Sequence, residues 1–222
     1  MSTNSYGYNE NLIEQQGKDA MLSSLSQCRR ARVLAAATPE ASKQALASGW
    51  LLEQSLRQQG IREPFVYHTS SRGKPYLVQD KGGIQFSLSH TRGLSAVALA
   101  QDAVGVDVER IGRGNEAVIN RFFSEGEKDY LKSCAGEEWE CNFTLCWTLK
   151  EAIAKCLDVN LLQICRDVDV SVCVPEVLKK EQRIKIPGHA DLSVRSYPVA
   201  NYVISGACVR EEDFSLKFID KY

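Results

Sequence analysis

Residues 105–110 read GVDVER, and this short stretch decides how the rest of the chain is interpreted. Valine occupies every second position from Val104 to Val108, which predicts a β-strand, because neighbouring side chains on a strand point to opposite faces. Asp107 and Glu109 then share the other face, about 6.6 Å apart along the backbone. Two carboxylates at this spacing can converge on one Mg²⁺ ion, which prefers hard oxygen ligands. The solvated outer face of an edge strand would give the same pattern, so the strand alone leaves both interpretations open.

Composition limits the class of protein. The chain has 222 residues, of which 44% are hydrophobic and 25% are charged, and its formal net charge is −1. These values suit one large globular domain or two small ones, and they provide no basic field for nucleic acid. No apolar run reaches membrane-spanning length, and the polar N-terminus lacks the pattern of a signal peptide. We therefore expect a cytoplasmic protein that binds neither nucleic acid nor membranes.

The periodicity of apolar residues predicts helices and strands in a pattern that occurs twice. The two halves each contain a helix that includes a Trp-headed segment, WLLEQSLRQ or WTLKEAIAK, and strands follow each helix. We predict an α+β fold with two similar α/β subdomains, residues 1–104 and 105–222, which form a pseudo-dimer with the active site in the cleft between them. Chance is an alternative explanation for the likeness between the two halves. The predicted helices are 21–36, 40–59 and 138–157, and the predicted strands are 84–90, 94–101, 103–111, 168–174, 183–186, 191–198 and 201–209. Ser124 and Glu127 have the spacing of a capping box at the start of another helix.

The stretch CWTLKEAIAK, residues 146–155, adds candidate functional groups on a helix. Glu151 and Lys155 lie one turn apart, on a different face from the apolar stripe that includes Leu149 and Ile153. An ordinary surface ion pair between residues four apart explains this spacing. A third metal-binding carboxylate with an ammonium group for anionic oxygens explains it equally, and Lys150 is either part of that group or a solvated residue.

A third stretch, FSLSHTRG at residues 86–93, places hydroxyls and an imidazole at the end of a strand. Ser89 and His90 suit the oxygens of a phosphate, and a loop-capping cluster with nothing bound is the alternative. A hydrolase triad does not fit, because adjacent residues on a strand point to opposite faces and no G-x-S-x-G motif is present.

Taken together, these stretches resemble the 4′-phosphopantetheinyl transferase superfamily, in its larger two-subdomain, surfactin-synthetase-activating type. The family pattern is a G-[VI]-D-[VIL]-E strand, followed some forty residues later by W-[ST]-x-K-E-[AS]-x-x-K. This chain has GVDVE and WTLKEAIAK in that order, with GKPYL and FSLSH upstream and RFFSEGE between them. The resemblance covers roughly residues 42–157.

The resemblance implies an enzyme that transfers the 4′-phosphopantetheine arm of coenzyme A to a serine of an acyl or peptidyl carrier protein, with Mg²⁺, and releases 3′,5′-ADP. It implies that Asp107, Glu109 and Glu151 hold the metal ion and that Glu151 and Lys155 are catalytic. A monomer is expected, because one chain would build the whole cleft. The residues that the resemblance assigns to coenzyme A are Lys43, Lys74, Ser89, His90, Lys150 and Lys155.

Two features depart from the family pattern. The first twenty residues are polar, so we expect the opening strand of the family to be short or missing. The family resemblance implies a basic residue that meets the 3′-phosphate, and Lys43 is the nearest candidate. Arg29, Arg30 and Arg32 either contribute instead or form a solvated basic face. Two other functions stay open. One is a relative that binds a carrier protein or coenzyme A without transfer, and the other is an unrelated Mg²⁺-dependent phosphohydrolase that would cleave coenzyme A without any carrier.

Overall fold

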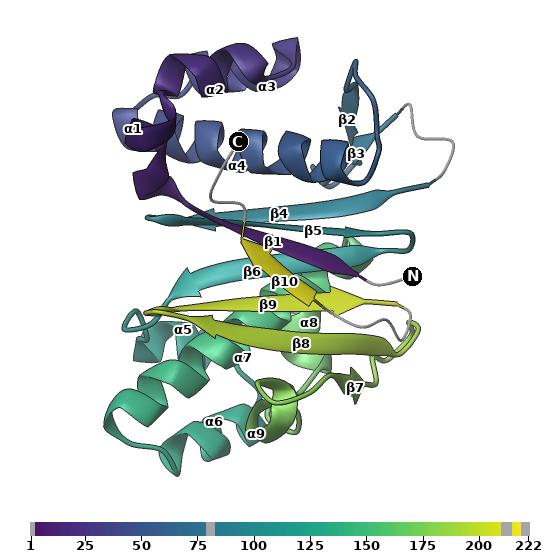
Figure 1. The fold of residues 1–222 in the computed structure, drawn as a ribbon. Helices are drawn as coiled ribbons and strands as arrows, with labels where there is room; N and C mark the ends of the chain where they lie inside the picture. The colour runs from purple at the N-terminus through teal and green to yellow at the C-terminus, as the bar shows by residue number, and fades with distance from the viewer. Residues whose placement is uncertain (1–2, 79–82, 210–214, 219–222) are drawn as a thin grey trace.

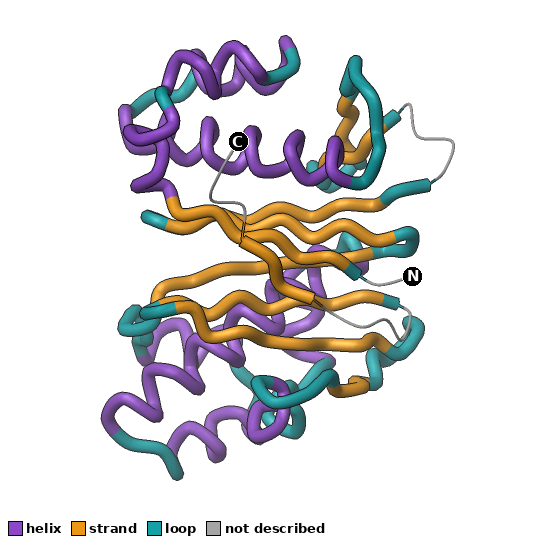
Figure 2. The backbone as a smooth tube through the Cα atoms, in the orientation of Figure 1, coloured by secondary structure: helices purple, strands orange, loops and turns teal. Residues whose placement is uncertain are grey.

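The structure is a computed structural model that describes residues 3–78, 83–209 and 215–218. Its longer strands form two sheets that face each other, and helices cover the outer face of each sheet (Figures 1 and 2). The first sheet has the order β10-β1-β5-β4, and the second has the order β6-β9-β8-β7. The strands are β1 (Asn4–Asn9), β4 (Gln85–Thr91), β5 (Leu94–Ala100), β6 (Val104–Arg110), β7 (Gln182–Ile184), β8 (Leu192–Val199), β9 (Tyr202–Cys208) and β10 (Ser215–Phe218), and β2 (Tyr67–Thr69) pairs with β3 (Pro75–Leu77) in a hairpin.

Two long helices organise the two layers. Helix α4 (Pro39–Gln58) packs on the first sheet, and helix α7 (Gly136–Leu157) packs on the second (Figure 1). The mixed α/β prediction is therefore confirmed. The shorter helices are η1 (Glu10–Leu12), α1 (Ile13–Gln16), α2 (Lys18–Ser24), α3 (Gln27–Leu34), α5 (Glu116–Phe122), α6 (Glu125–Lys132), α8 (Leu161–Asp167) and α9 (Val174–Val177). Among the described residues, no helix combines the length and apolar character needed to cross a membrane.

The two sheets share a topology. Strands β1, β4 and β5 lie in the spatial order β1-β5-β4 around α4, and strands β6, β8 and β9 lie in the order β6-β9-β8 around α7. Apart from the β2–β3 hairpin, the short strand β7 and the shorter helices, each half runs strand, long helix, strand, strand along the chain. Strand β10 departs from this scheme, because it follows β9 in sequence but pairs in parallel with β1 of the first sheet.

Small apolar side chains fill the layer between the sheets. Ala96 and Ala98 on β5 pack with Val104, Val106 and Val108 on β6, which confirms the predicted alternation of GVDVER. On the opposite face of β6, a Cβ atom at Gly105 would lie 1.9 Å from the backbone oxygen of Ala152. Only glycine permits this close approach, so α7 lies directly on the strand that carries the two carboxylates.

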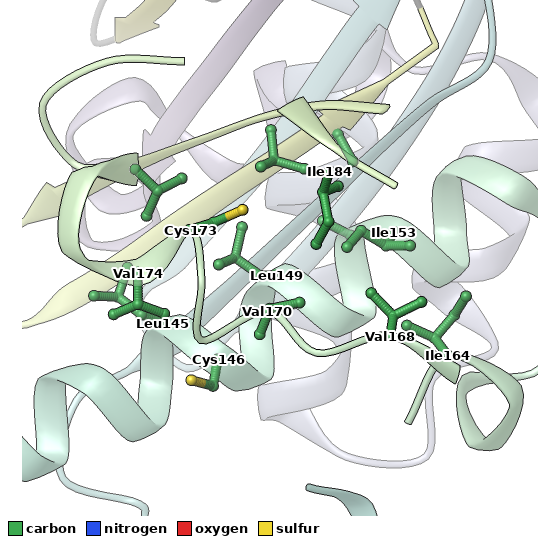
Figure 3. Packing of buried hydrophobic residues seen from close by; sticks show 14 of the residues in the cluster. Leu145, Cys146, Leu149, Ile153, Ile164, Val168, Val170, Cys173, Val174 and Ile184 are labelled. Atoms are coloured by element: carbon green, nitrogen blue, oxygen red, sulfur yellow. The ribbon is translucent and has the colours of Figure 1, made fainter. Parts of the chain in front are cut away.

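The core of the second half confirms the apolar stripe predicted on α7. Leu145, Leu149 and Ile153 are buried against Val168 and Ile164 (Figure 3). This packing fixes the rotation of α7 about its axis, so that Glu151 and Lys155 face away from the core.

The opening strand contradicts our expectation that it would be short or missing. Strand β1 pairs with β5 over its whole length, and its side chains Tyr6 and Tyr8 are buried against α4. The ring centroids of Tyr8 and Trp50 are 5.0 Å apart. The tyrosine rings supply the apolar surface of this strand, although the sequence of the segment looks polar.

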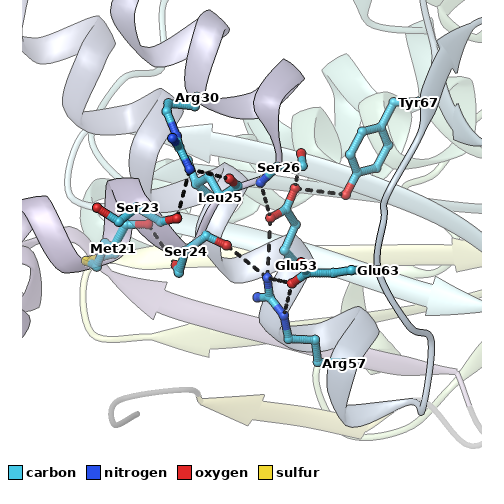
Figure 4. A network of polar contacts seen from close by, with 10 residues as sticks. All are labelled: Met21, Ser23, Ser24, Leu25, Ser26, Arg30, Glu53, Arg57, Glu63 and Tyr67. Atoms are coloured by element: carbon cyan, nitrogen blue, oxygen red, sulfur yellow. Dashed lines mark hydrogen bonds and ion pairs between the residues drawn. The ribbon is translucent and has the colours of Figure 1, made fainter.

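The predicted helix 21–36 is divided in two, because a buried carboxylate interrupts it. The backbone N–H of Ser26 donates to Glu53 at 2.9 Å, and the Ser26 hydroxyl donates to the same carboxylate (Figure 4). Tyr67 and Arg57 also contact Glu53, which is completely buried. The backbone leaves the helical conformation between α2 and α3, where these groups bond to the buried carboxylate.

The predicted strand 168–174 is also wrong. Val168 and Val170 are buried in alternation, as on a strand, but their backbone groups bond to side chains and to nearby backbone groups instead of a neighbouring strand. The Val170 N–H donates to Glu127 at 2.9 Å, and the Val168 carbonyl accepts from Lys150 at 2.9 Å. The chain then turns into α9.

Candidate active site

Asp107 lies where the edge of β6, the edge of β4 and helix α7 meet. Its Oδ1 atom accepts a hydrogen bond from Ser89 at 2.7 Å and lies 2.6 Å from the Lys155 ammonium group. Lys155 also donates to the Ser89 hydroxyl at 3.2 Å. The other oxygen of Asp107, Oδ2, is buried without a hydrogen-bond partner. A buried carboxylate oxygen without a donor is costly, so this atom is the available ligand of the cluster.

Glu109 lies two residues further along the same face of β6. Its Oε2 atom accepts a hydrogen bond from Thr91 at 3.2 Å, and Arg113 lies 3.7 Å from the same atom. Burial raises the pKa of Glu109 above its usual value, and the negative charge of Asp107 raises it further.

Glu151 on α7 lies in the same electrostatic cluster. Burial is the main cause of its raised pKa, with Asp107 the next largest cause and Lys155 acting in the opposite direction. Within residues 3–78, 83–209 and 215–218, no three His, Cys, Asp or Glu side chains are spaced as a ready-made metal centre.

The donor set fits a hard divalent cation. Three carboxylates, one with an orphaned oxygen, are the ligands that Mg²⁺ takes in proteins, where it usually keeps several waters as well. Asp107, Glu109 and Glu151 are therefore the residues that would hold it.

We predict that Mg²⁺ will raise the unfolding temperature most near neutral pH and progressively less as the pH falls towards about 5, because protons and the cation compete for Glu109 and Glu151. Without metal the sign is reversed. Folding favours the protonated form of a carboxyl with a raised pKa, so its contribution to stability is present at low pH and is lost as the pH rises through that pKa. Thermal unfolding across this range, with and without Mg²⁺, tests the prediction. A Mg²⁺ effect of equal size at every pH would contradict it, and the Glu109→Gln/Glu151→Gln variant should show almost no effect.

His90 lies beside the cluster but on the other face of β4. The residue is exposed, and its partial burial, with the positive charges of Lys155 and Arg32, lowers its pKa. The structure thus brings Ser89 and His90 to the two sides of one strand end, with Lys155 near both.

Lys74, which the resemblance assigns to coenzyme A, is half-buried and is held by backbone oxygens. Its ammonium group donates to the backbone oxygens of Val104, Lys155 and Cys156 at 3.1, 2.6 and 3.4 Å. Burial lowers its pKa. Three carbonyls occupy its three donors, so Lys74 ties the β2–β3 turn to the end of α7. A cavity of about 320 Å³ lies beside Lys74. Its lining includes Lys74, Ser87, Glu151 and Lys155.

Lys150 is the clearest departure from the predicted coenzyme A set. Its side chain is completely buried, lies 2.9 Å from the Glu127 carboxylate and donates to the Val168 carbonyl. Glu127 is also the N3 residue of the predicted capping box with Ser124, which the structure confirms. Lys150 is thus held in the core of the second half, and we do not carry it into the proposed site.

The basic residues of the first half separate into different environments. Lys43 is half-buried on α4, where its charge partly offsets the burial that raises the pKa of Glu10. Arg30 donates to backbone oxygens at the end of α2. Arg29 is buried, stacks 4.5 Å from the centre of the Tyr67 ring, and leaves Nε and Nη2 without hydrogen-bond partners. A cavity of about 220 Å³ has Arg29, Arg32, Tyr67, His68 and Thr69 in its lining.

Glu109 also lines a further cavity, which has a volume of about 170 Å³. Arg110 and Arg113 line it, with Val118 from α5 and Phe143 and Trp147 from α7. It combines apolar walls with two cationic groups, next to a proposed metal ligand.

Sequence patterns did not reveal the contacts of Thr91 and Arg113 with Glu109. Thr91 continues the alternation of Ser87 and Ser89, so the two-residue repeat of the strand could have indicated that it shares their face. Arg113 lies in the loop after β6, where no periodicity predicts the direction of a side chain.

Comparisons with known proteins place this geometry in context. The family model described as the 4′-phosphopantetheinyl transferase superfamily matches residues 103–205. The chain is 34% identical over 93 residues to the 4′-phosphopantetheinyl transferase psf-1 of Bacillus pumilus, covering 42% of this chain and 40% of the relative.

Two further relatives have similar names. The 4′-phosphopantetheinyl transferase gsp of Aneurinibacillus migulanus is 30% identical over 95 residues, covering 43% of this chain and 39% of that protein. The 4′-phosphopantetheinyl transferase ffp of Bacillus subtilis is 27% identical over 150 residues, covering 64% and 62%. The chain thus spans about two fifths of the length of the first two relatives that it matches.

Proposed function

Because the model of the 4′-phosphopantetheinyl transferase superfamily matches residues 103–205, we propose that the chain belongs to this superfamily and transfers the phosphopantetheine arm of coenzyme A to a serine of an acyl or peptidyl carrier protein. The observation that carries this proposal is the convergence of Asp107 and Glu109 on β6 with Lys155 and Glu151 on α7. The W-x-x-K-E-A-x-x-K helix and the G-V-D-V-E strand lie far apart in sequence, yet their charged residues form one cluster.

The chemistry asks for a base and for groups that stabilise negative charge. In transfer, the serine oxygen bonds to the β-phosphorus of coenzyme A, the bond from that phosphorus to the oxygen bridging the two phosphates breaks, and 3′,5′-ADP leaves. A bound Mg²⁺ would supply charge neutralisation at the pyrophosphate. Glu151 takes the serine proton, directly or through water, and its raised pKa makes it a stronger base than an ordinary carboxylate. Lys155 neutralises the departing phosphate.

Coenzyme A needs cationic and hydroxyl groups along the cleft between the halves. Ser89, His90 and Lys155 line its pyrophosphate end in this proposal, next to the cavity of about 320 Å³. The unpartnered guanidinium nitrogens of Arg29 and the nearby Arg32 support the first-half cavity of about 220 Å³ as the place for the nucleotide phosphate. They suit it better than Lys43, whose charge acts on Glu10.

The repeated strand-helix-strand-strand order supports a pseudo-dimer of two subdomains within one chain. Strands β4 and β6 come from different halves and both contribute to the cluster. One chain therefore supplies every group that the proposed chemistry uses, and we propose a monomer that acts in the cytoplasm.

We predict that Arg110→Glu will raise the KM for an acidic carrier protein about tenfold, while the KM for coenzyme A stays within about twofold. Arg110 lines the cavity beside Glu109, so a charge reversal there repels an acidic partner. Steady-state kinetics with each substrate varied in turn measures both constants. Arg62→Glu reverses an exposed charge in the first half and serves as the control. Equal effects of Arg110→Glu on both substrates would contradict this docking surface.

The proposed function is tested by the intact mass of an apo carrier protein after incubation with this protein, coenzyme A and Mg²⁺. We expect a gain of one phosphopantetheine arm, which disappears with EDTA and with Glu151→Ala. Glu138→Ala removes an exposed carboxylate from the same helix and should leave the gain intact. No gain with acyl and peptidyl carriers, in protein that still binds coenzyme A, would favour the non-catalytic relative. Cleavage of coenzyme A without any carrier would favour the phosphohydrolase.

A further inference from the structure

Strand β4 presents a row of hydroxyl groups to the edge of β6, although the two strands belong to different sheets. Ser87, Ser89 and Thr91 alternate along β4 and are all buried. Ser87 accepts the Val106 N–H at 3.0 Å, Ser89 donates to Asp107 at 2.7 Å, and Thr91 donates to Glu109 at 3.2 Å. The first half of the chain thus contacts both carboxylates of the second half through side-chain hydroxyls.

The side-chain groups that contact each carboxylate meet one of its two oxygens. Ser89 and Lys155 both reach Oδ1 of Asp107, whereas Oδ2 has no partner. Thr91 and Arg113 both reach Oε2 of Glu109. A carboxyl group held at one oxygen has a fixed rotation about its terminal bond, so the other oxygen has a defined direction in which a cation can bind.

We infer that Thr91 is a positioning residue for the metal centre, in which its hydroxyl orients Glu109 without touching the cation. The inference rests on the proposed function for the identity of the ligands. Thr91 is only 5% exposed, so bulk water has little access to replace its hydroxyl. Groups that orient metal ligands in this way commonly set metal affinity over one or two orders of magnitude.

The test uses Mn²⁺ as a spectroscopic substitute for Mg²⁺, in the absence of coenzyme A and carrier protein. Thr91→Val keeps the shape of the side chain and removes the hydroxyl, and we expect its Kd for Mn²⁺ to be about tenfold weaker than that of the wild type. Thr91→Ser restores a hydroxyl and should bring the Kd back to within about twofold. Electron paramagnetic resonance of free Mn²⁺ gives the Kd, and thermal unfolding verifies that each variant is folded.

Ser87→Ala is the matched control. It removes a hydroxyl from the same face of the same strand, but the partner of Ser87 is a backbone N–H and not a carboxylate. It should lower stability and leave the Kd for Mn²⁺ within about twofold of the wild type. A general loosening of the β4–β6 contact would weaken Mn²⁺ binding in Ser87→Ala as much as in Thr91→Val.

Three results would overturn the inference: an unchanged Kd in Thr91→Val, equal losses in Thr91→Val and Ser87→Ala, or no Mn²⁺ binding by the wild type. The last result would remove the metal assignment and leave the transfer reaction to the mass assay. A protein that fails the mass assay but shows the expected order of Mn²⁺ affinities would contradict the proposed function and support the role of Thr91.

Discussion

Asp107→Asn should lower the rate of phosphopantetheine transfer at least about a hundredfold and leave the fold intact. The asparagine keeps the shape of the side chain and a hydrogen-bond partner for Ser89, but it removes the charge next to Lys155 and the ionised oxygen that has no protein donor. A metal ligand is therefore lost without a cavity being created. We expect the Kd for Mn²⁺ to weaken as well, because Glu109 and Glu151 would remain as the only carboxylates of the proposed set.

Single-turnover transfer under saturating coenzyme A measures the effect most directly, because it separates chemistry from product release. Asp167→Asn, at an exposed position at the end of α8, is the matched control and should transfer at the wild-type rate. An Asp107→Asn variant that keeps more than about a tenth of the wild-type rate would show that the carboxylate pair is not the centre of the reaction.

Lys150→Met should lower the free energy of unfolding by about 3–5 kcal/mol. The methionine fills most of the lysine volume but leaves the completely buried Glu127 carboxylate without its cation and the Val168 carbonyl without its donor. Breaking one side of a buried ion pair exposes the full desolvation cost of the other side. Urea unfolding followed by far-ultraviolet circular dichroism gives the free energy.

Lys132→Met provides a comparison at nearly the same distance from a carboxylate. Lys132 lies 2.8 Å from Asp129, but both side chains are 72% exposed, so this substitution should leave stability almost unchanged. If too little Lys150→Met protein folds to be measured, Glu127→Gln tests the same pair from the other side. Similar stabilities for the Lys150 and Lys132 variants would contradict the role that we assign to burial.

Local sequence patterns correctly predicted the features that depend on residues close together in the chain. The alternation in GVDVER, the apolar stripe of α7 and the capping box at Ser124 each depend on residues a few positions apart, and all three agree with the structure. The strand predicted at 168–174 failed because burial alternates there while the hydrogen bonds go to Glu127 and Lys150, which lie far away in sequence.

The roles of lysines were the least predictable part of the site. Lys74, Lys150 and Lys155 all lie in or near recognisable motifs, and a sequence gives each of them the same charge. Their functions differ because Lys74 meets three carbonyls, Lys150 meets a buried glutamate and Lys155 meets a carboxylate at the edge of a cavity. These partners come from other elements, so only the folded chain separates a structural ammonium group from a candidate catalytic one.

The pairing of β10 with β1 has a consequence for the order in which the protein can be completed during synthesis. Residues 4–7 are synthesised long before residues 215–218, which are their partners on one side. Until residues 215–218 are made, β1 can pair with β5 but keeps its other edge open, and open strand edges are sites of association between chains. The first sheet therefore acquires its last strand only after the second half has been made.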